Sequence, residues 1–368
     1  MPLEFNAVRF KNKNTPLAIK KTSLPVKQDA TGELEVASDR ILVKVKAAAL
    51  NPVDLLLKSA VIPLFSFSEK GFASDYSGDV VAIGASAAAK TSLKVGDKVC
   101  GINQVPFGDG TLGEYTLVNP FKKTGASIRR FPEKLTYEQA AAYPLVFGTA
   151  ESLFDHSKHE KNGKNLNSFN KVLILGAGTS VGRFTVQLAK QVYGSEHIVV
   201  TCSGKTEPIA RGYGATEVID YTKHKNILNP VLESVKATGK FDAILDCCGN
   251  NDLFPQIGEI IKSRDVGGSY ITLVGDAKID YSKGIFPMLV KNLSAVFRGM
   301  KSRWGFLPYY YQLITLDGND PWPDHVVEYF EKHNIEVTID SVYDFDHFQQ
   351  AVDKLESNRA VGKLVITL

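Results

Sequence analysis

The stretch Leu173 to Gly182, LILGAGTSVG, decides the fold of this chain. An apolar run ends in a glycine-rich turn, and the turn leads directly into Val181 to Lys190, whose apolar residues recur with helical spacing. Glycines let the backbone approach a pyrophosphate, and the positive end of the following helix holds its negative charge. Gly176, Gly178 and Gly182 are spaced GxGxxxG instead of the commoner GxGxxG. The context predicts a dinucleotide-binding turn, and the alternative is an ordinary strand, turn and helix.

The same rhythm of apolar run, turn and helix continues after this turn. Apolar runs recur in HIVVTC (197–202), FDAILDCCG (241–249) and GGSYITLVGD (267–276), with amphipathic segments at Pro208 to Tyr213 and Leu253 to Lys262 between them. Strands that alternate with helices at this spacing indicate βαβ units. We therefore predict an α/β fold with a doubly wound parallel sheet.

The end of the second strand bears on the choice of cofactor. NAD-binding domains usually carry an acid about 20 residues beyond the glycines, where it binds the ribose 2′-OH. Here the strand end reads Thr201-Cys202-Ser203-Gly204-Lys205 and has no acid. A hydroxyl and a cation suit a 2′-phosphate, so the sequence favours NADPH over NADH. The alternative is that Lys205 is a solvated lysine in an ordinary turn.

The segments before residue 130 have a different pattern. Arg40 to Ala48 alternates apolar and polar residues, and Gly78 to Gly84 is an apolar run between glycines, which indicates a β-rich region. A helix is predicted to begin after Thr136, and Ala85 to Ala89 is expected to be a surface loop. At the C-terminal end we expect a helix within 344–356 and a strand within 362–367 that return to this first region.

Composition excludes several classes of protein. The 368 residues are enough for two domains, and 44% apolar with 23% charged residues is typical of globular proteins. A net charge of +3 is too small for an obligate nucleic-acid binder, so the expected partner is a small molecule. Cys100, Cys202, Cys247 and Cys248 are too scattered for a disulfide framework, and no long apolar run predicts a membrane span. We expect a cytoplasmic protein.

Six short motifs along the chain resemble one enzyme family. They are ALNPVD (49–54), ASDYSGDVV (73–81), GTLGEY (110–115), PLVFGTA (144–150), GATEVIDY (214–221) and AVGKLV (360–365). Together they resemble the medium-chain dehydrogenase/reductase superfamily in its zinc-free, quinone-oxidoreductase-like branch. Within that branch the chain is most similar to the fungal Yim-type group.

The resemblance implies a GroES-like β-rich catalytic domain interrupted by a Rossmann domain. The expected limits are 1–145 for the first catalytic part, 146–310 for the NADPH-binding domain and 311–368 for the return to the catalytic domain. By position, the residues expected near the pyrophosphate are Gly178, Thr179, Ser180 and Val181. Those expected near the 2′-phosphate are Ser203, Lys205 and Tyr221. For Tyr221 the alternative, equally supported by the sequence, is an aromatic side chain packed at the end of a strand. Those expected on the nicotinamide side are Asn51, Thr149, Leu273, Val274 and Lys363.

The residue types argue against a metal site. Tetrahedral zinc takes Cys and His ligands, but the positions that the zinc-dependent branch uses hold Val53-Asp54 and Ser74-Asp75-Tyr76. Cys247 and Cys248 are adjacent, so they point to opposite faces of a strand. His156 and His159 stand among lysines and are expected in an exposed polar loop.

Without a Lewis acid, the expected chemistry is hydride addition to a quinone or an α,β-unsaturated carbonyl compound, where the charge is delocalised. Related enoyl-thioester reductases carry a tyrosine shortly after the Asn-Pro turn, and residues 55–63 contain none. Asn51 and Lys58 are left as candidates to orient or polarise the substrate. The alternative for Lys58 is an ordinary solvated lysine on a helix.

An apolar substrate pocket is expected to include residues 62–67 and the aromatic run Trp304 to Tyr311. Alternatively, these residues belong to the hydrophobic core. A further alternative is that the region 284–311, which carries several basic residues, contacts a lipid surface. The expected substrate is a small apolar carbonyl compound or quinone, and the expected state a monomer or homodimer. The second hypothesis is an NADPH-binding protein with little catalysis that acts through a protein partner or lipid surface, at a lipid droplet or mitochondrion.

Overall fold

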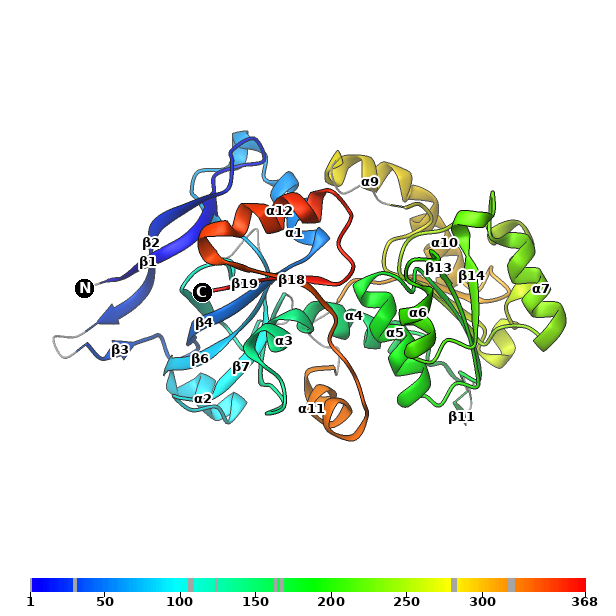
Figure 1. Ribbon diagram of the computed structural model, residues 1–368, viewed down its shortest axis with the longest axis horizontal. Coiled ribbons are helices and arrows are strands. Elements are labelled where there is room, and N and C mark those ends of the chain that lie inside the picture. The colour runs from blue at the N-terminus through cyan, green and yellow to red at the C-terminus, as the bar shows by residue number, and fades with distance from the viewer. Residues whose placement is uncertain are drawn as a thin grey trace.

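The structure is a computed structural model that describes residues 2–28, 32–104, 109–122, 125–161, 164–165, 169–278, 283–316 and 322–368. Two halves lie side by side (Figure 1): a β-rich half that holds both chain ends, and an α/β half made from the middle of the chain.

The α/β half is built on a parallel sheet of six strands in the order β14-β13-β12-β15-β16-β17. Its strands are β12 (Lys171–Leu175), β13 (His197–Cys202), β14 (Glu217–Asp220), β15 (Ala243–Asp246), β16 (Ser269–Thr272) and β17 (Tyr310–Leu313). Every residue of β12 is buried, as its unbroken apolar run predicts for a central strand. The strand order reverses direction between β12 and β15, which confirms the doubly wound sheet.

Helices cover both faces of this sheet over two separate apolar clusters. They are α4 (Pro144–Asp155), α5 (Ser180–Gln191), α6 (Glu207–Gly212), α7 (Leu228–Thr238), α8 (Ile257–Ile260), α9 (Ile285–Lys291) and α10 (Leu293–Arg303). The helix expected over residues 253–262 is wrong in its extent, because a 3-10 turn at Phe254–Gln256 precedes the short α8. The backbone leaves the helical conformation at Gln256, with φ −130° and ψ 27°, and again at Ile261, which pairs with Phe241 as an isolated parallel bridge.

The β-rich half contains a seven-stranded sheet in the order β18-β19-β4-β6-β7-β9, with β8 paired to β4, and a four-stranded sheet in the order β3-β2-β1-β5. The first comprises β4 (Ile41–Leu50), β6 (Asp75–Ile83), β7 (Lys98–Asn103), β8 (Tyr115–Val118), β9 (Ala126–Arg130), β18 (Ile339–Asp344) and β19 (Lys363–Thr367). The second comprises β1 (Pro2–Phe10), β2 (Ala18–Gln28), β3 (Leu34–Glu35) and β5 (Lys70–Gly71). Because β19 pairs antiparallel with β4, the expected return of the C-terminal segment is confirmed.

The helices that pack in the β-rich half and along the junction are α1 (Pro52–Ala60), α2 (Ala85–Thr91), α3 (Tyr137–Ala142), α11 (Trp322–Lys332) and α12 (Phe348–Glu356). Thr136 caps α3 as expected, and its hydroxyl accepts the N–H of Gln139. The surface loop expected at Ala85 to Ala89 is wrong, because these residues begin α2 and Ala87 is buried. Alanine has the highest helix propensity, and the buried Ala87 joins the core under β4 and β6.

Specific contacts fasten the two halves together. Arg183 of α5 is buried and donates to the carbonyl of Val361 at 3.1 Å, just before β19. Gln187, one turn later, exchanges two hydrogen bonds with the backbone of Glu336. The domain limits that we expect at residues 146 and 310 lie in the first turn of α4 and at the first residue of β17.

Candidate functional site

The glycine turn after β12 presents backbone donors in place of side chains. Gly176 has φ +82°, and a Cβ at Gly182 would lie 2.2 Å from the carbonyl oxygen of Gly176, so both positions need glycine. Thr179 caps α5, and its hydroxyl accepts the N–H of Gly182 at 2.9 Å. Ser180 and Val181 lie in the first turn of α5, so no carbonyl of the helix lies four residues before them to accept their backbone N–H groups. Two amide donors at a positive helix end are the set that a pyrophosphate requires.

The turn packs against the loop that follows β13. A Cβ at Gly178 would lie 2.8 Å from the hydroxyl of Thr206, so a larger residue at this position requires the Thr206 side chain to shift. Ser203, half-buried, and Lys205, exposed, stand in this loop, and Tyr221 is 47% exposed at the end of the neighbouring β14. Ser203, Lys205 and Tyr221 form what we call the cofactor rim. A hydroxyl, an ammonium and a phenol therefore lie at the ends of adjacent strands, where a phosphate on the ribose is expected.

One acidic residue at the cofactor rim escaped the sequence analysis. Asp220 precedes Tyr221, and its carboxylate accepts the N–H and the hydroxyl of Thr222 at 3.0 and 2.7 Å. The same carboxylate lies 3.7 Å from the ammonium of Lys223. The hydrogen bonds from Thr222 hold the pKa of Asp220 below its ordinary value, so Asp220 stays ionised. The signal was present in the quoted motif GATEVIDY, but only the tertiary pairing of β13 with β14 brings this charge to the rim.

A buried polar cluster lies where the two halves meet. The ammonium of Lys363 donates to the Asn51 amide oxygen at 2.5 Å and to the Asp75 carboxylate at 2.9 Å. The Asn51 amide nitrogen also donates to Asp75, at 2.9 Å. Asp54 accepts the N–H of Asn51 at 2.8 Å and the hydroxyl of Ser74 at 2.6 Å. Asn51, Asp54, Asp75 and Lys363, with Ser74, form the buried cluster, and the residues are at most 3% exposed.

The buried cluster holds two carboxyl groups and one ammonium. Burial raises the pKa of Asp54 to about 7, and the nearby charge of Asp75 adds to this effect, while the bonds from Ser74 and Asn51 and the charge of Lys363 oppose it. Asp54 therefore carries a proton at pH values below about 7. Sequence analysis named Asn51 and Lys363 but missed Asp54 and Asp75 as polar partners, although both lie in the quoted motifs.

The hydrogen-bond capacity of the buried cluster is not exhausted. An amide nitrogen has two donor hydrogens and an ammonium has three. Within the described residues, Asn51 uses one of its two and Lys363 uses two of its three. One N–H of Asn51 and one of Lys363 therefore have no acceptor among the described residues, and donors of this kind can polarise a carbonyl oxygen.

Lys58 is not brought into the buried cluster. It lies in the last turn of α1, and its ammonium donates to the carbonyl of Lys13 at 3.1 Å, near the ring of Phe10. Burial lowers the pKa of Lys58, and the charge of Glu356 opposes that shift.

The other residues expected on the nicotinamide side are distributed over two elements. Thr149 is buried in α4, and its hydroxyl donates to the carbonyl of Leu145 at 2.7 Å. The N–H of Leu145 donates in turn to Asp75, so Thr149 lies one turn from the buried cluster. Leu273 and Val274 follow β16 at the carboxyl edge of the parallel sheet. The hydroxyl of Thr272 accepts the N–H of Val274 and fixes the direction of this segment.

The histidine pair expected in an exposed polar loop is partly packed, so that expectation is wrong. His159 stacks on Tyr310 with ring centroids 3.5 Å apart, and burial lowers its pKa to about 4. His156 lies 3.1 Å from the amide of Gln312. In the part of the chain that the structure describes, no group of three or more His, Cys, Asp or Glu side chains is arranged to hold a metal ion.

The aromatic region expected as pocket or core is divided. Tyr309 and Tyr311 are buried in the α/β half, whereas Trp304 and Phe306 are 62% and 73% exposed. The exposed apolar residues of α9 and α10 are Phe286, Leu289, Val290, Leu293, Val296, Phe297 and Met300. In the earlier segment, Leu64 and Phe67 are also exposed. The core reading is therefore wrong for these side chains. No described helix is long and apolar enough to cross a membrane.

Comparisons with known proteins agree with this architecture. Two family models match the chain: an alcohol dehydrogenase GroES-like domain over residues 37–125 and a zinc-binding dehydrogenase domain over residues 213–366. The chain is 35% identical to the protein YIM1 of Vanderwaltozyma polyspora, covering 98% of each, and 32% identical to YIM1 of Saccharomyces cerevisiae, covering 98% of this chain and 97% of that one.

Solved structures share the fold. A quinone oxidoreductase from Coxiella burnetii matches with a TM-score of 0.71 at 20% identity, covering all of both chains. A mycobacterial protein complexed with NADPH matches with a TM-score of 0.67 at 18% identity, over 99% of this chain and 100% of that one.

Proposed function

Because the chain belongs to the medium-chain dehydrogenase/reductase superfamily, alongside the fungal YIM1 proteins, we propose that it is an NADPH-dependent, zinc-independent reductase of quinones or α,β-unsaturated carbonyl compounds. The observation that carries this proposal is the pairing of a glycine turn fit for a pyrophosphate with a junction that still offers two N–H donors. A fold of this kind supports NAD(P)-linked redox chemistry, and the donors suit an oxygen on which charge develops.

The proposed choice of NADPH rests on the cofactor rim. Lys205 and Ser203 supply a charge and a hydroxyl to a 2′-phosphate, and no acid follows β13 where NAD-binding domains place one. Asp220 opposes this preference through its ionised carboxylate, whereas Lys223 beside it offsets that charge. The balance favours the phosphorylated cofactor, and the mycobacterial protein complexed with NADPH supports this choice.

The bound nicotinamide would supply one hydride, which is two electrons and a proton. The acceptor carbon of the quinone or enone would take the hydride as the C–H bond of the reduced nicotinamide breaks, the conjugated C=C electrons would shift toward the carbonyl carbon, and the C=O electron pair would move to the oxygen as an enolate or phenolate anion. The remaining N–H groups of Asn51 and Lys363 stabilise that oxyanion, and a proton from water completes the reduction. A simple ketone instead gives a localised alkoxide, for which the described residues offer no metal.

The experiment is a substrate screen with purified protein. We expect NADPH oxidation with quinones or reactive enones, essentially none with ethanol, acetone or simple aldehydes, and no change after extensive chelation. Tight NADPH binding without turnover of any quinone or enone contradicts the reductase. A stoichiometric zinc that is lost together with activity contradicts zinc independence.

A second candidate function is favoured by the exposed apolar side chains of α9 and α10. An NADPH-binding protein with little catalysis would use such a surface to meet a protein partner or a lipid surface. This candidate predicts association with a lipid droplet or mitochondrial surface, whereas the reductase is proposed for the cytoplasm as a monomer or homodimer. A screen without turnover, together with tight cofactor binding, supports the second candidate.

A further inference from the structure

Arg183 is a buried charge that neither the cofactor rim nor the buried cluster explains. It follows Gly182 in the first turn of α5 and is 2% exposed. Its Nη1 donates to the carbonyl of Val361 at 3.1 Å. Within the part of the chain that the structure describes, its Nε and Nη2 atoms are buried and have no hydrogen-bond partner. Burial lowers the pKa of Arg183, and the charges of Tyr213 and Asp340 oppose that shift.

Stability alone does not account for an arginine at this position. A buried charge loses its hydration, and only good pairing and a full set of hydrogen bonds offset this loss. The side chain of Arg183 makes one hydrogen bond to the described residues, so an apolar side chain of similar length would fill the same space without the cost of desolvation. The bond to Val361 is therefore the feature of Arg183 that calls for an explanation.

Val361 is held from both halves of the molecule. Its carbonyl accepts from Arg183 on α5, and its N–H donates to the carboxylate of Asp340 in β18 at 2.6 Å. The other oxygen of that carboxylate pairs with Lys354 of α12. The α/β half thus reaches this point through Arg183, and the β-rich half reaches it through Asp340.

Val361 begins the turn that leads to Lys363. Gly362 has φ +140°, and a Cβ there would lie 2.9 Å from both the nitrogen of Asp340 and the carbonyl oxygen of Thr338, so the turn leaves no room for a side chain. The N–H of Lys363 donates to the carbonyl of Thr338 at 3.0 Å. The place of Lys363 in the buried cluster therefore depends on where Val361 is held.

Each half is proposed to hold one of the two reactants. The glycine turn at the start of α5 is the proposed site of the NADPH pyrophosphate, and Asn51 and Lys363 are proposed to bind the oxygen of the acceptor. Hydride transfer needs the reacting atoms about 3–3.5 Å apart, and a displacement of about 1 Å can cost about 100-fold in rate. A contact that fixes α5 against the turn before Lys363 therefore bears directly on this distance.

Gln187 provides a comparison on the same helix. It lies one turn after Arg183, is 1% exposed, and exchanges two hydrogen bonds with the backbone of Glu336, at 3.1 and 2.7 Å. Glu336 precedes β18 and is not part of the turn that leads to Lys363. Gln187 therefore joins the two halves as Arg183 does, but at a different segment.

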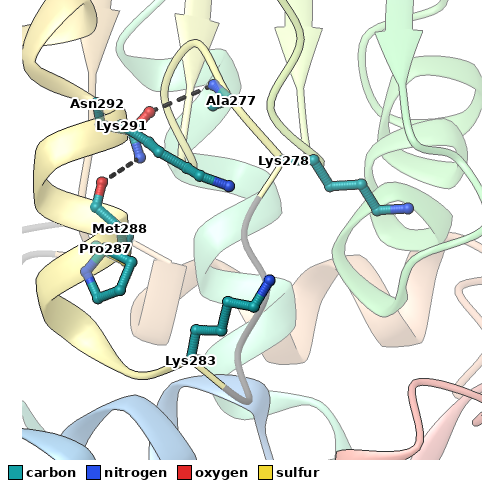
Figure 2. A pocket seen from close by; sticks show the side chains of 7 residues that line it. All are labelled: Ala277, Lys278, Lys283, Pro287, Met288, Lys291 and Asn292. Carbon is teal, nitrogen blue, oxygen red and sulfur yellow. Dashed lines mark hydrogen bonds between the residues drawn. The ribbon is translucent and has the colours of Figure 1, made fainter.

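A third contact between the halves lies at α9. The N–H of Ile285 donates to the hydroxyl of Ser59 on α1 at 3.0 Å. Asn292 ties α9 to the segment after β16, because its amide oxygen accepts the N–H of Ala277 at 3.3 Å and its amide nitrogen donates to the carbonyl of Met288 at 3.1 Å (Figure 2). This contact reaches the last turn of α1, at the opposite end of that helix from the buried cluster.

We propose that Arg183 is a positioning residue for hydride transfer, which sets the place of Lys363 relative to the glycine turn through its bond to Val361. The proposal rests on the proposed reductase function and adds to it a residue that acts through Val361 and Lys363. The role is geometric, so it affects the rate of the chemical step more than the affinity for NADPH.

The experiment compares Arg183→Met with the wild type, using a quinone at saturating concentration. We expect kcat to fall at least about tenfold, because the register of the two halves is loosened. The Kd for NADPH, measured by calorimetry, should change less than about threefold. The urea midpoint should not fall, since an apolar side chain replaces a partly paired buried charge. With NADPH deuterated at the transferred position, the isotope effect on kcat should increase, because hydride transfer then limits the rate.

Gln187→Leu is the matched control. It removes a buried polar side chain of α5 that also joins the halves, and it leaves the backbone groups of Glu336 without their partner. Its urea midpoint should fall, because those groups stay desolvated. Its kcat should remain within about twofold of the wild-type value, since the turn before Lys363 is untouched.

Three results would overturn the positioning role. The first is an unchanged kcat in R183M, and the second is a loss of kcat in R183M no larger than in Q187L. The third is a loss of NADPH affinity that accounts for the whole effect, because Arg183 would then serve the cofactor. If R183M does not fold, R183K takes its place: a kcat at least about threefold lower with unchanged NADPH affinity supports the role, and an unchanged kcat overturns it.

Hydrogen exchange separates this proposal from the reductase function. If the wild type binds NADPH but reduces no quinone, the reductase fails separately, and exchange of the backbone N–H groups of residues 361–367 decides the link between α5 and Lys363. Slower exchange on NADPH binding in the wild type and Q187L, but not in R183M, supports the link. Equal protection in all three proteins, or none in the wild type, overturns it. Absence of NADPH binding overturns both proposals.

Discussion

The cofactor rim and the buried cluster both carry charged groups at the edge of a sheet, but their surroundings differ. Lys205 and Tyr221 face solvent, and Lys205 has no partner among the described residues. Lys363 and Asp75 are almost fully buried and bind each other directly. Exposed charges are screened by solvent and contribute little to the free energy of folding. A buried charge that loses its partner destabilises the folded state by several kcal/mol, because it stays desolvated without compensation. The rim should therefore affect ligand choice, and the buried cluster should affect the stability of the junction.

The largest expected effect is on stability, from Asp75→Ala. This change removes the carboxylate that pairs with Lys363 and accepts the N–H of Leu145, so an ammonium is left buried beside Asn51 alone. We expect a loss of about 3–5 kcal/mol in the free energy of unfolding, measured by urea denaturation. The control Asp324→Ala breaks the exposed pair with Arg129 and should cost less than about 1 kcal/mol. Equal losses in the two variants would contradict the comparison.

The next effect is on cofactor binding, from Gly178→Asp. A Cβ at this position would lie 2.8 Å from the Thr206 hydroxyl, and the new carboxylate would repel a pyrophosphate. We expect NADPH affinity to fall at least 100-fold, or about 2.7 kcal/mol, with thermal unfolding little changed. Gly258→Asp is the matched control, because a Cβ there meets no heavy atom within 4 Å. Unchanged NADPH affinity in Gly178→Asp would exclude the glycine turn as the phosphate site.

A pH effect separates Asp54 from the exposed acids. The pKa of Asp54 is about 7 in the folded protein and about 3.9 when unfolded, so between these values the folded state holds a proton that the unfolded state has released. Stability should therefore decrease as pH rises through this window, by up to roughly 1.4 kcal/mol per pH unit, and level off above about pH 7.

Asp246 complicates only the lower part of this window, because burial raises its pKa to about 6. Between about pH 6 and 7 Asp54 lowers stability as pH rises, whereas His159, whose pKa burial lowers to about 4, raises it, because the unfolded histidine still binds protons near pH 6.5. The contribution of Asp54 is therefore the difference between the wild type and Asp54→Asn, and the variant should lose stability less steeply with rising pH in that interval, as measured by denaturation at several pH values. A slope identical to that of the wild type would show that Asp54 is ionised throughout.

A smaller effect is expected at the cofactor rim from Lys205→Ala. The wild type should bind NADPH at least about tenfold more tightly than NADH, which is about 1.4 kcal/mol and within reach of one charge-assisted contact. The variant should lose most of this preference through weaker NADPH binding, with NADH binding nearly unchanged in calorimetry. Lys225→Ala is an exposed lysine control. Equal affinity of the wild type for both cofactors would count against the proposed rim.

The smallest expected effect comes from Asp220→Asn. The amide oxygen can still accept from Thr222, but the negative charge beside Lys223 is removed. The preference for NADPH over NADH should rise about twofold to threefold, because the charge is partly screened. A fall in this preference would mean that Asp220 acts by holding the loop rather than by its charge.

Much of the fold was predictable from local patterns. The glycine turn, the alternation of strand and helix and the Thr136 cap each depend on residues within a few positions of one another. The errors arose where packing overrides the pattern, as at α2, where a short alanine segment becomes a helix with Ala87 buried, and at Ile261, which pairs with Phe241 and ends α8 early. His159 was also misjudged, because the polar residues beside it do not reveal that Tyr310 covers its ring.

The sequence by itself determined the α/β architecture, the family and the chemical types available at the site, because these are written in short motifs and periods. Only the tertiary structure decided which groups meet. Lys363 reaches Asn51 across 312 residues and Asp75 across 288, and burial in the same junction raises the pKa of Asp54 to about 7 although the charge of Lys363 opposes this shift. Desolvation and pairing depend on distance in space, which residue spacing along the chain does not specify.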